Sequence, residues 1–550
     1  MKRLLLSLLM MLVCSGTALA TSRQVPAQYT TIQAAIDASA YGDVVVVAAG
    51  TYSDCTHPAP MPDGTLCVAI MKSGVSIQGA GPGITIIDAL GLGRGIYCNG
   101  VVEATIEGLT IRGAFALEHG AGIYCYNGSS PTIQNCVVRD NTDGGIIVRW
   151  NSHPTISNVT MSHNFGKEGG GLYIAVSSNP IITSCFVDSN SAPIGGGVSI
   201  LNSAPQFRNS FIRHNAISGA GGGWGGGLTI KSSTPWFMNC SVLDNTSKGG
   251  GGGAYVEEGT ATFILCTIMG NRTTEAYGPG GGLFLSYSNV TLEDRLIARN
   301  TVVGTQVFPL LSDGGGIRVL GGPGELTIRR CTIAANSAAS GLGGGVSNNF
   351  CSPIIEQSII ANNSLGAGLY CDDAEYGAFT VSCTDLYGNA GGNAICGTNA
   401  GGNFSLNPLF CDLANNNFRL QTASPCQPGA HPNGPAACGG NLIGGLGGDC
   451  SPAGVIDAEA SLALETRPNP FRGSTEIRFD VPRAGRVSVA VYDAAGREVR
   501  SLAEGVMAAG PHAVAWDGAD ASGRRVPSGV YFYRLSLDGR TEGRRVIVTR

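Results

Sequence analysis

The sequence predicts an all-β protein in which a long parallel β-solenoid is followed by a small antiparallel β-sandwich. Three observations carry this prediction. An eleven-residue segment that ends in Asn recurs nine times between residues 131 and 363, and a glycine run followed by a short apolar stretch recurs between the copies. Beyond residue 461 the repeat stops and short alternating stretches rich in Arg take its place. Neither part carries the 3.6-residue apolar period of a helix.

The composition excludes several classes of protein. Of the 550 residues, 83 are Gly and 26 are Pro, but 43% are hydrophobic, which excludes a disordered chain. Charged residues make up 13%, about half the usual share, which argues against a charged helical bundle. The formal net charge of −5 provides no basic surface for nucleic acid, so we expect no nucleic-acid partner.

The N-terminus has the pattern of an export signal. Lys2 and Arg3 precede an apolar run at 4–13, and Ala18-Leu19-Ala20 matches a signal-peptidase site. We therefore predict a signal peptide over residues 1–20, cleaved near Ala20, and a secreted or cell-surface protein. Lipidation at Cys14 is an alternative that the preceding Val disfavours. No later segment has 18 uninterrupted apolar residues, so we expect no membrane span.

The repeat follows one template of apolar and polar positions. Its copies run from PTIQNCVVRDN at 131–141 to PIIEQSIIANN at 353–363, and the closing asparagines are 23 to 36 residues apart. Each unit holds two or three strands, which are too few to bury an apolar face alone. Stacked units bury it, because each strand pairs in parallel with its counterpart one coil away and like residues form columns. The region from about 75 to 410 has room for roughly 13 coils.

The positions of the template have separate roles. Apolar residues such as Ile133, Cys136 and Val138 are expected to form the inward columns. The closing asparagines are expected to bond to neighbouring backbone at a tight turn, and Gly is expected to let the other corner take a positive φ. The closing asparagines are Asn141, Asn164, Asn190, Asn215, Asn245, Asn271, Asn300, Asn336 and Asn363.

The cysteines fall into two classes. Five share one inward position of the repeat, where we expect buried free thiols: Cys136, Cys185, Cys240, Cys266 and Cys331. Cys55 and Cys67 flank a turn-rich stretch, and we expect a disulfide there. We also expect disulfides within a Gly/Pro-rich region that holds Cys411, Cys426, Cys438 and Cys450. The sequence leaves the connectivity open.

The C-terminal part is predicted to be a separate domain. Residues 446–461 form a Gly/Ala-rich linker, and residues 462–550 hold 14 Arg, no Lys and 10 acidic residues. Alternating strands separated by turn residues suit a small antiparallel β-sandwich. The strands are expected at 474–481, 486–493, 512–518, 530–537 and 544–550.

The repeat resembles the right-handed parallel β-helix proteins of the pectate-lyase-like superfamily, which include polysaccharide enzymes. Its paired V/I-x-x-N and G-G-G-[LIV] elements are also similar to the repeats of chlamydial polymorphic membrane proteins, which are adhesins. YTTIQAAIDASAYGDVVVVAAGTY at 29–52 resembles the N-terminal part of the family, which implies a capping helix around Ile32 and Ile36. NPLFCDLANNNFRLQTASPC at 407–426 resembles the last coil of bacterial members. This resemblance implies a cap and first coil at 21–74 and a right-handed β-helix at 75–445.

The C-terminal domain, 462–550, also resembles known domains. Its segments NPF, VYDAAGREVRSL, AGPHAVAWDG and SGVYFYRL are similar to the immunoglobulin-like domain of flagellar hook-capping proteins and to the C-terminal sorting domain of the type IX secretion pathway. This resemblance implies an export and attachment tag read by secretion machinery. The ending Val-Thr-Arg departs from the Lys-rich apolar strand of the sorting domains. A structural sandwich without an export role is the alternative.

One candidate site is the column of residues that precede the closing asparagines. On adjacent coils these side chains would lie about 5 Å apart. Carboxylates beside imidazoles can raise imidazole basicity or hold a metal, and Ca²⁺ would suit a lyase of this fold. Ordinary turn chemistry is the competing explanation. The candidate catalytic residues are Asp140, His163, Ser189, His214 and Asp244.

A second candidate site lies on the strands after the glycine runs. Alternation predicts that one column there points outward, and exposed aromatic rings can stack on sugars. Aromatic residues also fit strands well, or can be covered by loops. The column contains Tyr124, Ile147, Tyr173, Ser199, Thr229, Tyr255, Phe284 and Arg318. The candidate carbohydrate-binding residues are Tyr124, Tyr173, Tyr255 and Phe284, with Trp224 and Trp236 expected to project from the same region.

These features lead to three functional hypotheses. The first is an exported, non-catalytic or weakly catalytic β-helix protein that binds polysaccharides or cell-surface glycans. The second is a polysaccharide lyase or glycoside hydrolase acting at the column from Asp140 to Asp244. The third is a structural surface or adhesin component that needs neither column. In each case we expect a monomer.

Overall fold

The structure is a computed structural model of the chain. It describes residues 20–549 apart from gaps at 60–63, 117–120, 220–222, 276, 306–312, 322–324, 373–374, 376, 449, 451–464, 482–484, 494–496, 508–509 and 538–539. The predicted signal peptide, except Ala20, and residues 449 and 451–461 of the predicted linker lie outside the described residues.

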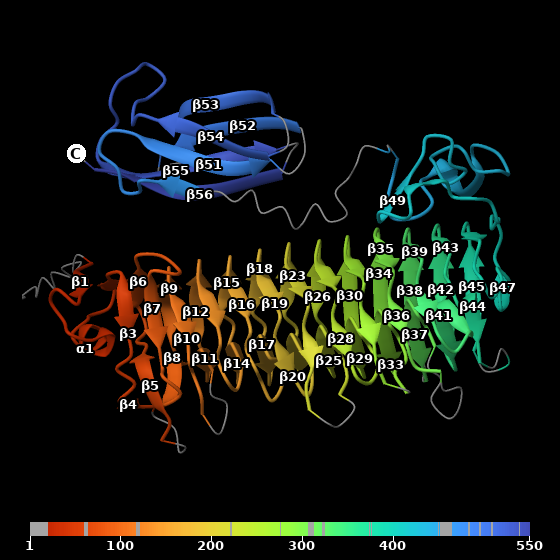
Figure 1. Cartoon of the computed structure of the whole chain (residues 1–550), viewed down its shortest axis with the longest axis horizontal. Helices are drawn as coiled ribbons and strands as arrows, with labels where there is room; N and C mark the ends of the chain where they lie inside the picture. The colour runs from red at the N-terminus through yellow and green to blue at the C-terminus, as the bar shows by residue number, and fades with distance from the viewer. Residues whose placement is uncertain are drawn as a thin grey trace, which may run out of the picture. The chain divides into compact units, whose positions relative to one another are not determined.

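The chain divides into two compact units. The first comprises Met1–Pro408 with Ala423–Gly447, and the second comprises Leu409–Thr422 with Gly448–Arg550. The first unit is a parallel β-solenoid in which each coil adds one strand to each of three long sheets (Figure 1). Within the described residues, sheet A has 15 strands: β1 Ser22–Val25, β2 Val44–Val47, β6 Ser76–Gly79, β9 Val102–Glu107, β12 Ser130–Gln134, β15 Thr155–Ser157, β18 Ile181–Thr183, β22 Gln206–Arg208, β26 Trp236–Met238, β30 Thr260–Ile264, β34 Asn289–Glu293, β38 Leu326–Arg329, β42 Ile354–Glu356, β45 Phe379–Ser382 and β47 Gly397–Asn399.

Sheets B and C complete the coils, each with 13 strands in the described part of the chain. Sheet B holds β3 Gly50–Tyr52, β7 Thr85–Asp88, β10 Thr110–Arg112, β13 Val137–Arg139, β16 Thr160–Ser162, β19 Phe186–Asp188, β23 Phe211–Arg213, β27 Ser241–Leu243, β31 Thr267–Met269, β35 Leu296–Ala298, β39 Thr332–Ala334, β43 Ile359–Ala361 and β46 Asp385–Tyr387. Sheet C holds β4 His57–Pro58, β5 Leu66–Ile70, β8 Gly93–Asn99, β11 Ile123–Tyr126, β14 Ile146–Arg149, β17 Leu172–Ala175, β21 Val198–Leu201, β25 Leu228–Lys231, β29 Ala254–Glu257, β33 Leu283–Ser286, β37 Ile317–Leu320, β41 Gly343–Asn349 and β44 Ala367–Cys371.

Shorter elements fill one corner and the ends. A sheet of two-residue strands follows sheet B: β20 Ser191–Ala192, β24 Ala216–Ile217, β28 Thr246–Ser247, β32 Arg272–Thr273, β36 Thr301–Val302 and β40 Ser337–Ala338. Near the N-terminal end, helix α1 (Ile32–Asp37) begins where the Thr31 hydroxyl accepts a hydrogen bond from the amide of Ala34, and it buries Ile32, Ala35 and Ile36. A 3-10 helix, η1 (Ala437–Gly440), lies in the C-terminal part of the unit.

The predicted inward columns are confirmed by the strand register. Ile133 pairs with Ile156 one coil on, and in later coils Phe207 pairs with Phe237, which pairs with Phe263. These three phenylalanines stack at ring-centroid distances of 4.8 and 4.6 Å. Because each coil presents the same apolar positions, the columns merge into one core along the solenoid axis.

The asparagine ladder is confirmed and is longer than the repeat predicts. Each side-chain amide donates to a carbonyl of the preceding coil and to the Oδ1 atom of the next asparagine. Asn245, for example, donates to the Ile212 carbonyl at 2.9 Å and to Asn271 at 3.0 Å. The ladder continues beyond Asn363 to Asn389, whose Nδ2 donates to Asn393. At another corner the first Gly of each run has a positive φ, such as +72° at Gly225, where a Cβ would lie 2.1 Å from a backbone oxygen.

The structure confirms one cysteine prediction and corrects another. The five repeat cysteines are buried and free, as predicted. Cys55 and Cys67 do not form the predicted disulfide, because Cys55 belongs to the solenoid core whereas Cys67 packs with the tyrosines outside sheet C. In the Gly/Pro-rich region Cys426 is free. The disulfides join Cys371 to Cys396, Cys383 to Cys438, and Cys411 to Cys450.

The second unit contains the predicted β-sandwich and a hairpin of β48 (Phe410–Asp412) and β49 (Asn417–Leu420). Its two antiparallel sheets enclose a core around Phe479, Trp516 and Tyr533. One sheet has the order β50 (Glu465–Arg467), β51 (Thr475–Val481) and β54 (Gly510–Trp516). The other has the order β53 (Glu498–Met507), β52 (Gly485–Tyr492), β55 (Gly529–Leu537) and β56 (Arg540–Val548). Among the described residues of either unit, no helix is long and apolar enough to span a bilayer.

Candidate functional site

The predicted polar column lies at the turn that follows sheet B. Strands β13, β16, β19, β23 and β27 pair in register, so the residue after each strand occupies the same place on successive coils. All five residues have φ between +51° and +56°: Asp140, His163, Ser189, His214 and Asp244. Asp, Asn and His are enriched in this left-handed region, so backbone geometry accounts for part of the polar pattern.

Asp188 is the centre of the contacts at this column. Its Oδ1 atom lies 3.1 Å from Nδ1 of His214 and accepts a hydrogen bond from Ser189, while its Oδ2 atom accepts one from Arg213. Burial raises the pKa of Asp188, but the hydrogen bonds from His214, Ser189 and Arg213 outweigh it and hold this pKa below the usual value. The Asp188 side chain is 24% exposed and is joined to the column by these contacts.

The five predicted residues do not form one network. His214 Nε2 lies 3.9 Å from an Asp244 oxygen, so His214 has a carboxylate on each side. Asp140 pairs instead with Arg139. His163 is exposed, and among the described residues no side-chain hydrogen bond or ion pair joins it to the group. The arrangement provides one imidazole oriented by carboxylates at an open turn, where it could act as a base.

No metal centre is evident at these positions. Among the described residues, no group of three or more His, Cys, Asp and Glu side chains is placed to hold a metal ion. Ca²⁺ binding therefore stays a prediction.

The aromatic column outside sheet C is buried, which corrects the predicted exposure. Its aromatic members are between 1% and 9% exposed: Tyr124, Tyr173, Tyr255 and Phe284. Alternation correctly places them on the outer face, but other side chains cover that face, some of them from segments that precede the strands. Trp224, from one such segment, lies 5.2 Å from Tyr255 and 5.4 Å from Phe284. Burial raises the pKa of Tyr255 to about 12.

The two tryptophans do not project from one region as predicted. Trp224 covers sheet C, whereas Trp236 begins strand β26 of sheet A. Trp236 is half-buried, and the guanidinium of Arg208 lies 5.2 Å from its ring centroid. Trp236 is therefore the member of the predicted aromatic set that lies on a different face of the solenoid, away from the covering segments.

An ion-pair cluster lies farther along the outer face of sheet C. Arg318 is 3% exposed and contacts Asp313 at 3.1 Å and Asp372 at 2.6 Å. Burial raises the pKa of Asp313 to about 6, although Arg318 and a hydrogen bond from Ser347 act in the opposite direction. The sequence placed Arg318 in the aromatic column but gave no reason to expect its acidic partners, Asp313 and Asp372, which lie outside the strands.

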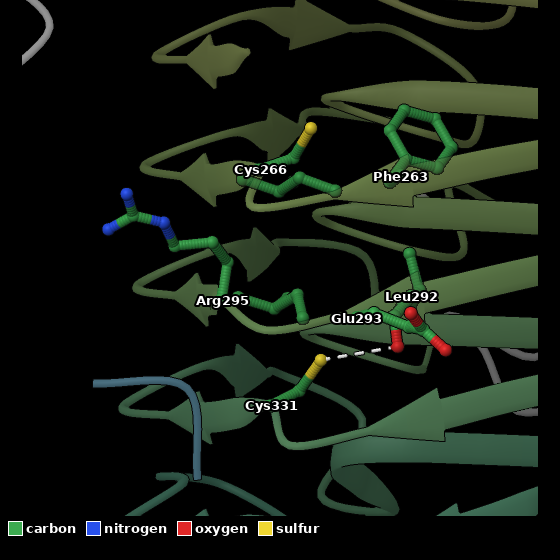
Figure 2. Close-up of a pocket in the computed structure, with 8 residues that line it drawn as sticks. Phe263, Cys266, Leu292, Glu293, Arg295 and Cys331 are labelled. Carbon is green, nitrogen blue, oxygen red and sulfur yellow. Dashed lines mark hydrogen bonds between the residues drawn. The ribbon is translucent and has the colours of Figure 1, made fainter. Parts of the chain in front are cut away.

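A small cavity lies at the corner between sheets A and B (Figure 2). Its volume is about 10 Å³, room for about one water molecule. Arg295 occupies the repeat position that Cys266 and Cys331 hold in neighbouring coils, and its guanidinium points away from Phe263 and Leu292 (Figure 2). The cavity forms where a packed sulfur is replaced by a side chain that turns outward, and it is too small for a sugar ring.

Comparison with known families agrees with this architecture. A family model described as the right-handed beta helix region matches residues 73–268 and 226–410. The chain belongs to the right-handed β-helix family. A second family model, the FlgD Ig-like domain, matches residues 467–540 of this β-helix protein.

Several solved structures are similar to parts of this β-helix protein. Dimeric latent PorU from Porphyromonas gingivalis is 28% identical over 16% of this chain and 9% of its own, with a TM-score of 0.14. Pectate lyase Pel9A is 12% identical over 52% of this chain and 68% of its own, with a TM-score of 0.31. The GH87 α-1,3-glucanase of Streptomyces thermodiastaticus strain HF3-3 is 12% identical over 71% of each chain, with a TM-score of 0.34. No curated protein matches the chain.

Proposed function

We propose that this β-helix protein is exported, remains at or near the cell surface, and binds polysaccharide or surface glycans along the outer face of sheet A. The open character of this face is the observation that carries the proposal. From β12 to β42 the outward side chains of sheet A all keep solvent access, in contrast to the covered aromatic column of sheet C. A long, open strand face can contact many units of a polymer at once.

The chemistry of this face suits sugars. Thr132, Thr155 and Thr262 provide hydroxyl groups, and Gln134 and Gln206 provide amides. Trp236 adds an aromatic ring, and the Arg208 guanidinium lies over it at 5.2 Å. Hydroxyl and amide groups can replace the hydrogen bonds that a sugar makes to water, while an aromatic face packs against the C–H groups of a sugar ring.

Export and attachment are assigned to the two ends of the chain. The N-terminal pattern that ends at Ala20 supports export, and the FlgD Ig-like domain at 467–540 supports a role in secretion or surface attachment. In this proposal the solenoid holds the glycan and the β-sandwich engages the secretion machinery.

The alternative function, a polysaccharide lyase or glycoside hydrolase, has support from the carboxylate-flanked imidazole of His214. Release of unsaturated or reducing ends from a polysaccharide, lost in a His214→Ala variant that still folds, would favour it over pure binding.

Replacing Trp236 by Ala is expected to weaken glycan binding by roughly three- to tenfold, because the aromatic surface for a sugar ring is lost. Binding of the full mature chain to a panel of soluble and insoluble polysaccharides can be measured by pull-down and by affinity electrophoresis. Phe532→Ala provides a matched control, because Phe532 is a 45% exposed aromatic residue on β55 of the β-sandwich. If no polysaccharide in the panel binds at micromolar protein, the proposal is wrong.

A further inference from the structure

The edge between sheets C and A carries a column of left-handed turn residues. From β8 to β41, the residue directly after each sheet C strand has φ between +48° and +70°, including Asn127, Trp150, Glu258, Tyr287 and Phe350. The register of sheet C places them on successive coils at one edge of the solenoid. Gly and Asn occupy this backbone region with little strain, whereas bulky aromatic residues rarely do.

Three of these turn residues are aromatic and open to solvent. Trp150 is 49% exposed, Tyr287 is 60% exposed and Phe350 is 51% exposed. The solenoid core does not require them, because the same turn accepts Asn127 and Glu258 in other coils. Large rings that are exposed and held in an unfavourable backbone conformation are a pattern typical of functional positions.

Trp150 has an aromatic neighbour and polar side chains around it. The ring of Tyr126, from the preceding coil, meets Trp150 edge-on at 6.4 Å. Planar amides and an imidazole border the pair. Asn127 donates to Asn99, and Asn151 lies 3.3 Å from His153. Aromatic faces bordered by amide and imidazole groups match a sugar ring, which is apolar on its faces and hydroxylated at its rim.

A glycine of the next coil leaves room for the ring of Tyr287. A Cβ atom at Gly321 would lie 2.8 Å from the Tyr287 ring, so the ring lies across the next coil where a side chain is absent. A similar arrangement occurs near the N-terminal end, where a Cβ at Gly74 would lie 2.2 Å from the ring of Tyr41, which is 64% exposed. In both places a tyrosine ring occupies the space that a side chain on the glycine would need.

We infer that this edge is a binding track for a neutral polysaccharide that lies parallel to the solenoid axis, with sugar rings stacked on Trp150, Tyr287 and Phe350. The inference rests on the proposed glycan-binding function and assigns it a second set of residues and a substrate class. Five strand steps separate Trp150 from Tyr287 and two separate Tyr287 from Phe350, which correspond to about 24 Å and about 10 Å. Such spacings suit an extended polymer rather than a monosaccharide.

The charges along the edge favour a neutral polymer. Lys231 and Glu257, on neighbouring coils, pair at 2.9 Å, and the guanidinium of Arg149 lies 5.7 Å from the Tyr173 ring centroid. Glu258 adds a negative charge at the turn itself. A polyuronate would meet no continuous row of cations here. A neutral glucan or mannan carries no charge, so its binding does not need such a row.

The test compares glycan affinity in the Trp150→Ala, Tyr287→Ala double variant and in the wild-type chain. The probes are a soluble β-glucan, a soluble mannan and polygalacturonate, measured by isothermal titration and affinity electrophoresis. We expect the double variant to lose tenfold or more in affinity for the neutral polymer with an unchanged melting temperature. The matched control is Tyr277→Ala, because Tyr277 is 50% exposed but lies in the segment between β32 and β33, away from this edge.

The outcomes separate this inference from the function on which it rests. An affinity of the double variant within twofold of wild type, together with a loss on Trp236→Ala, overturns the track and leaves the proposed function in place. Tighter binding of polygalacturonate than of either neutral polymer overturns the assigned substrate class. If the wild-type chain binds no polymer at all, both proposals are wrong.

Discussion

Replacing Asn245 by Ala is expected to lower the free energy of unfolding of the solenoid by about 3–5 kcal/mol. Asn245 is fully buried, and its side-chain amide donates to the Ile212 carbonyl and to Asn271. Its oxygen accepts hydrogen bonds from the backbone and side-chain amides of Asn215. Alanine removes all four hydrogen bonds and leaves polar groups of Ile212 and Asn215 buried without these partners. Urea and thermal unfolding of the two chains measure the difference.

Asn239→Ala is the matched control. Asn239 lies in the same coil and its side chain donates to Asn209, but that side chain is exposed and, unlike Asn245, the residue has a positive φ. We expect a cost of about 1 kcal/mol or less, because water can replace the lost partner. In Asn245→Ala, hydrogen exchange should show that amide protection is lost mainly in the coils on either side, since each coil contacts only its neighbours. An equal decrease in the free energy of unfolding in the two variants would show that the asparagine ladder is not a main source of stability.

Replacing Asp385 by Asn is expected to make the stability of the solenoid less sensitive to pH between about 4 and 7. Asp385 is fully buried at the start of β46, where its carboxyl group accepts hydrogen bonds from the Leu406 amide at 3.1 Å and from Cys426 at 3.4 Å. Burial raises its pKa to about 7, against a smaller lowering by these hydrogen bonds. The unfolded chain ionises at about pH 3.9, so the folded state holds an extra proton between the two values.

The sign of this effect follows from the raised pKa. The contribution of Asp385 to stability is complete below about pH 4 and is lost as pH rises through about 7, by an amount on the order of 3–4 kcal/mol. The amide that replaces the carboxyl group cannot ionise, so the stability of the variant relative to wild type should increase by that amount between about pH 4 and pH 8. Asp188→Asn is a control of opposite sign, because the pKa of Asp188 is lowered, and its pH-dependent effect is expected below about pH 4, with none between about pH 4 and pH 8. A difference between wild type and Asp385→Asn that stays constant with pH would contradict the account.

The repeated parts of the chain could be predicted from the sequence because the same residue type does the same work in every coil. Asn141, Asn245 and Asn363 bond alike, and Ile133 and Phe237 belong to one continuous core. A column is visible in a sequence whenever its members recur at one template position. The β-sandwich could be predicted for a related reason, since its strands alternate and its turns carry Gly, Asp and Ala.

The covering segments could not be predicted, because they differ in length and composition from coil to coil. Alternation assigns Tyr255 and Phe284 to the outer face of sheet C, but it does not say what lies above that face. The residues that cover them, such as Trp224, belong to no repeated position. The same reason applies to Cys371, Cys383 and Cys396, whose disulfide partners are set by irregular chain near the end of the solenoid.

The five positions of the candidate polar column stack on successive coils, but the contacts of their side chains could not be predicted from the repeat. A repeat specifies the backbone position of each side chain, whereas an ion pair also depends on the conformation of the two side chains. Asp188 reaches sideways to His214 on the next coil, and Asp140 turns to Arg139 instead of to His163. The exposed aromatic residue Trp150 could not be recognised from the repeat. Among the turns of this edge only Tyr287 and Phe350 are also exposed aromatic residues, and they lie several coils away.

The most direct test of the central claim, that the open faces of the solenoid hold the glycan while the buried column does not, is hydroxyl-radical footprinting of the full chain with and without a bound polysaccharide. The account predicts that oxidation of Trp150, Tyr287 and Trp236 slows when the polymer is bound. Tyr124 and Tyr173 should be oxidised slowly in both states, because they are at most 6% exposed. A polymer-dependent change at Tyr124 and Tyr173, with none at the three exposed rings, would contradict it.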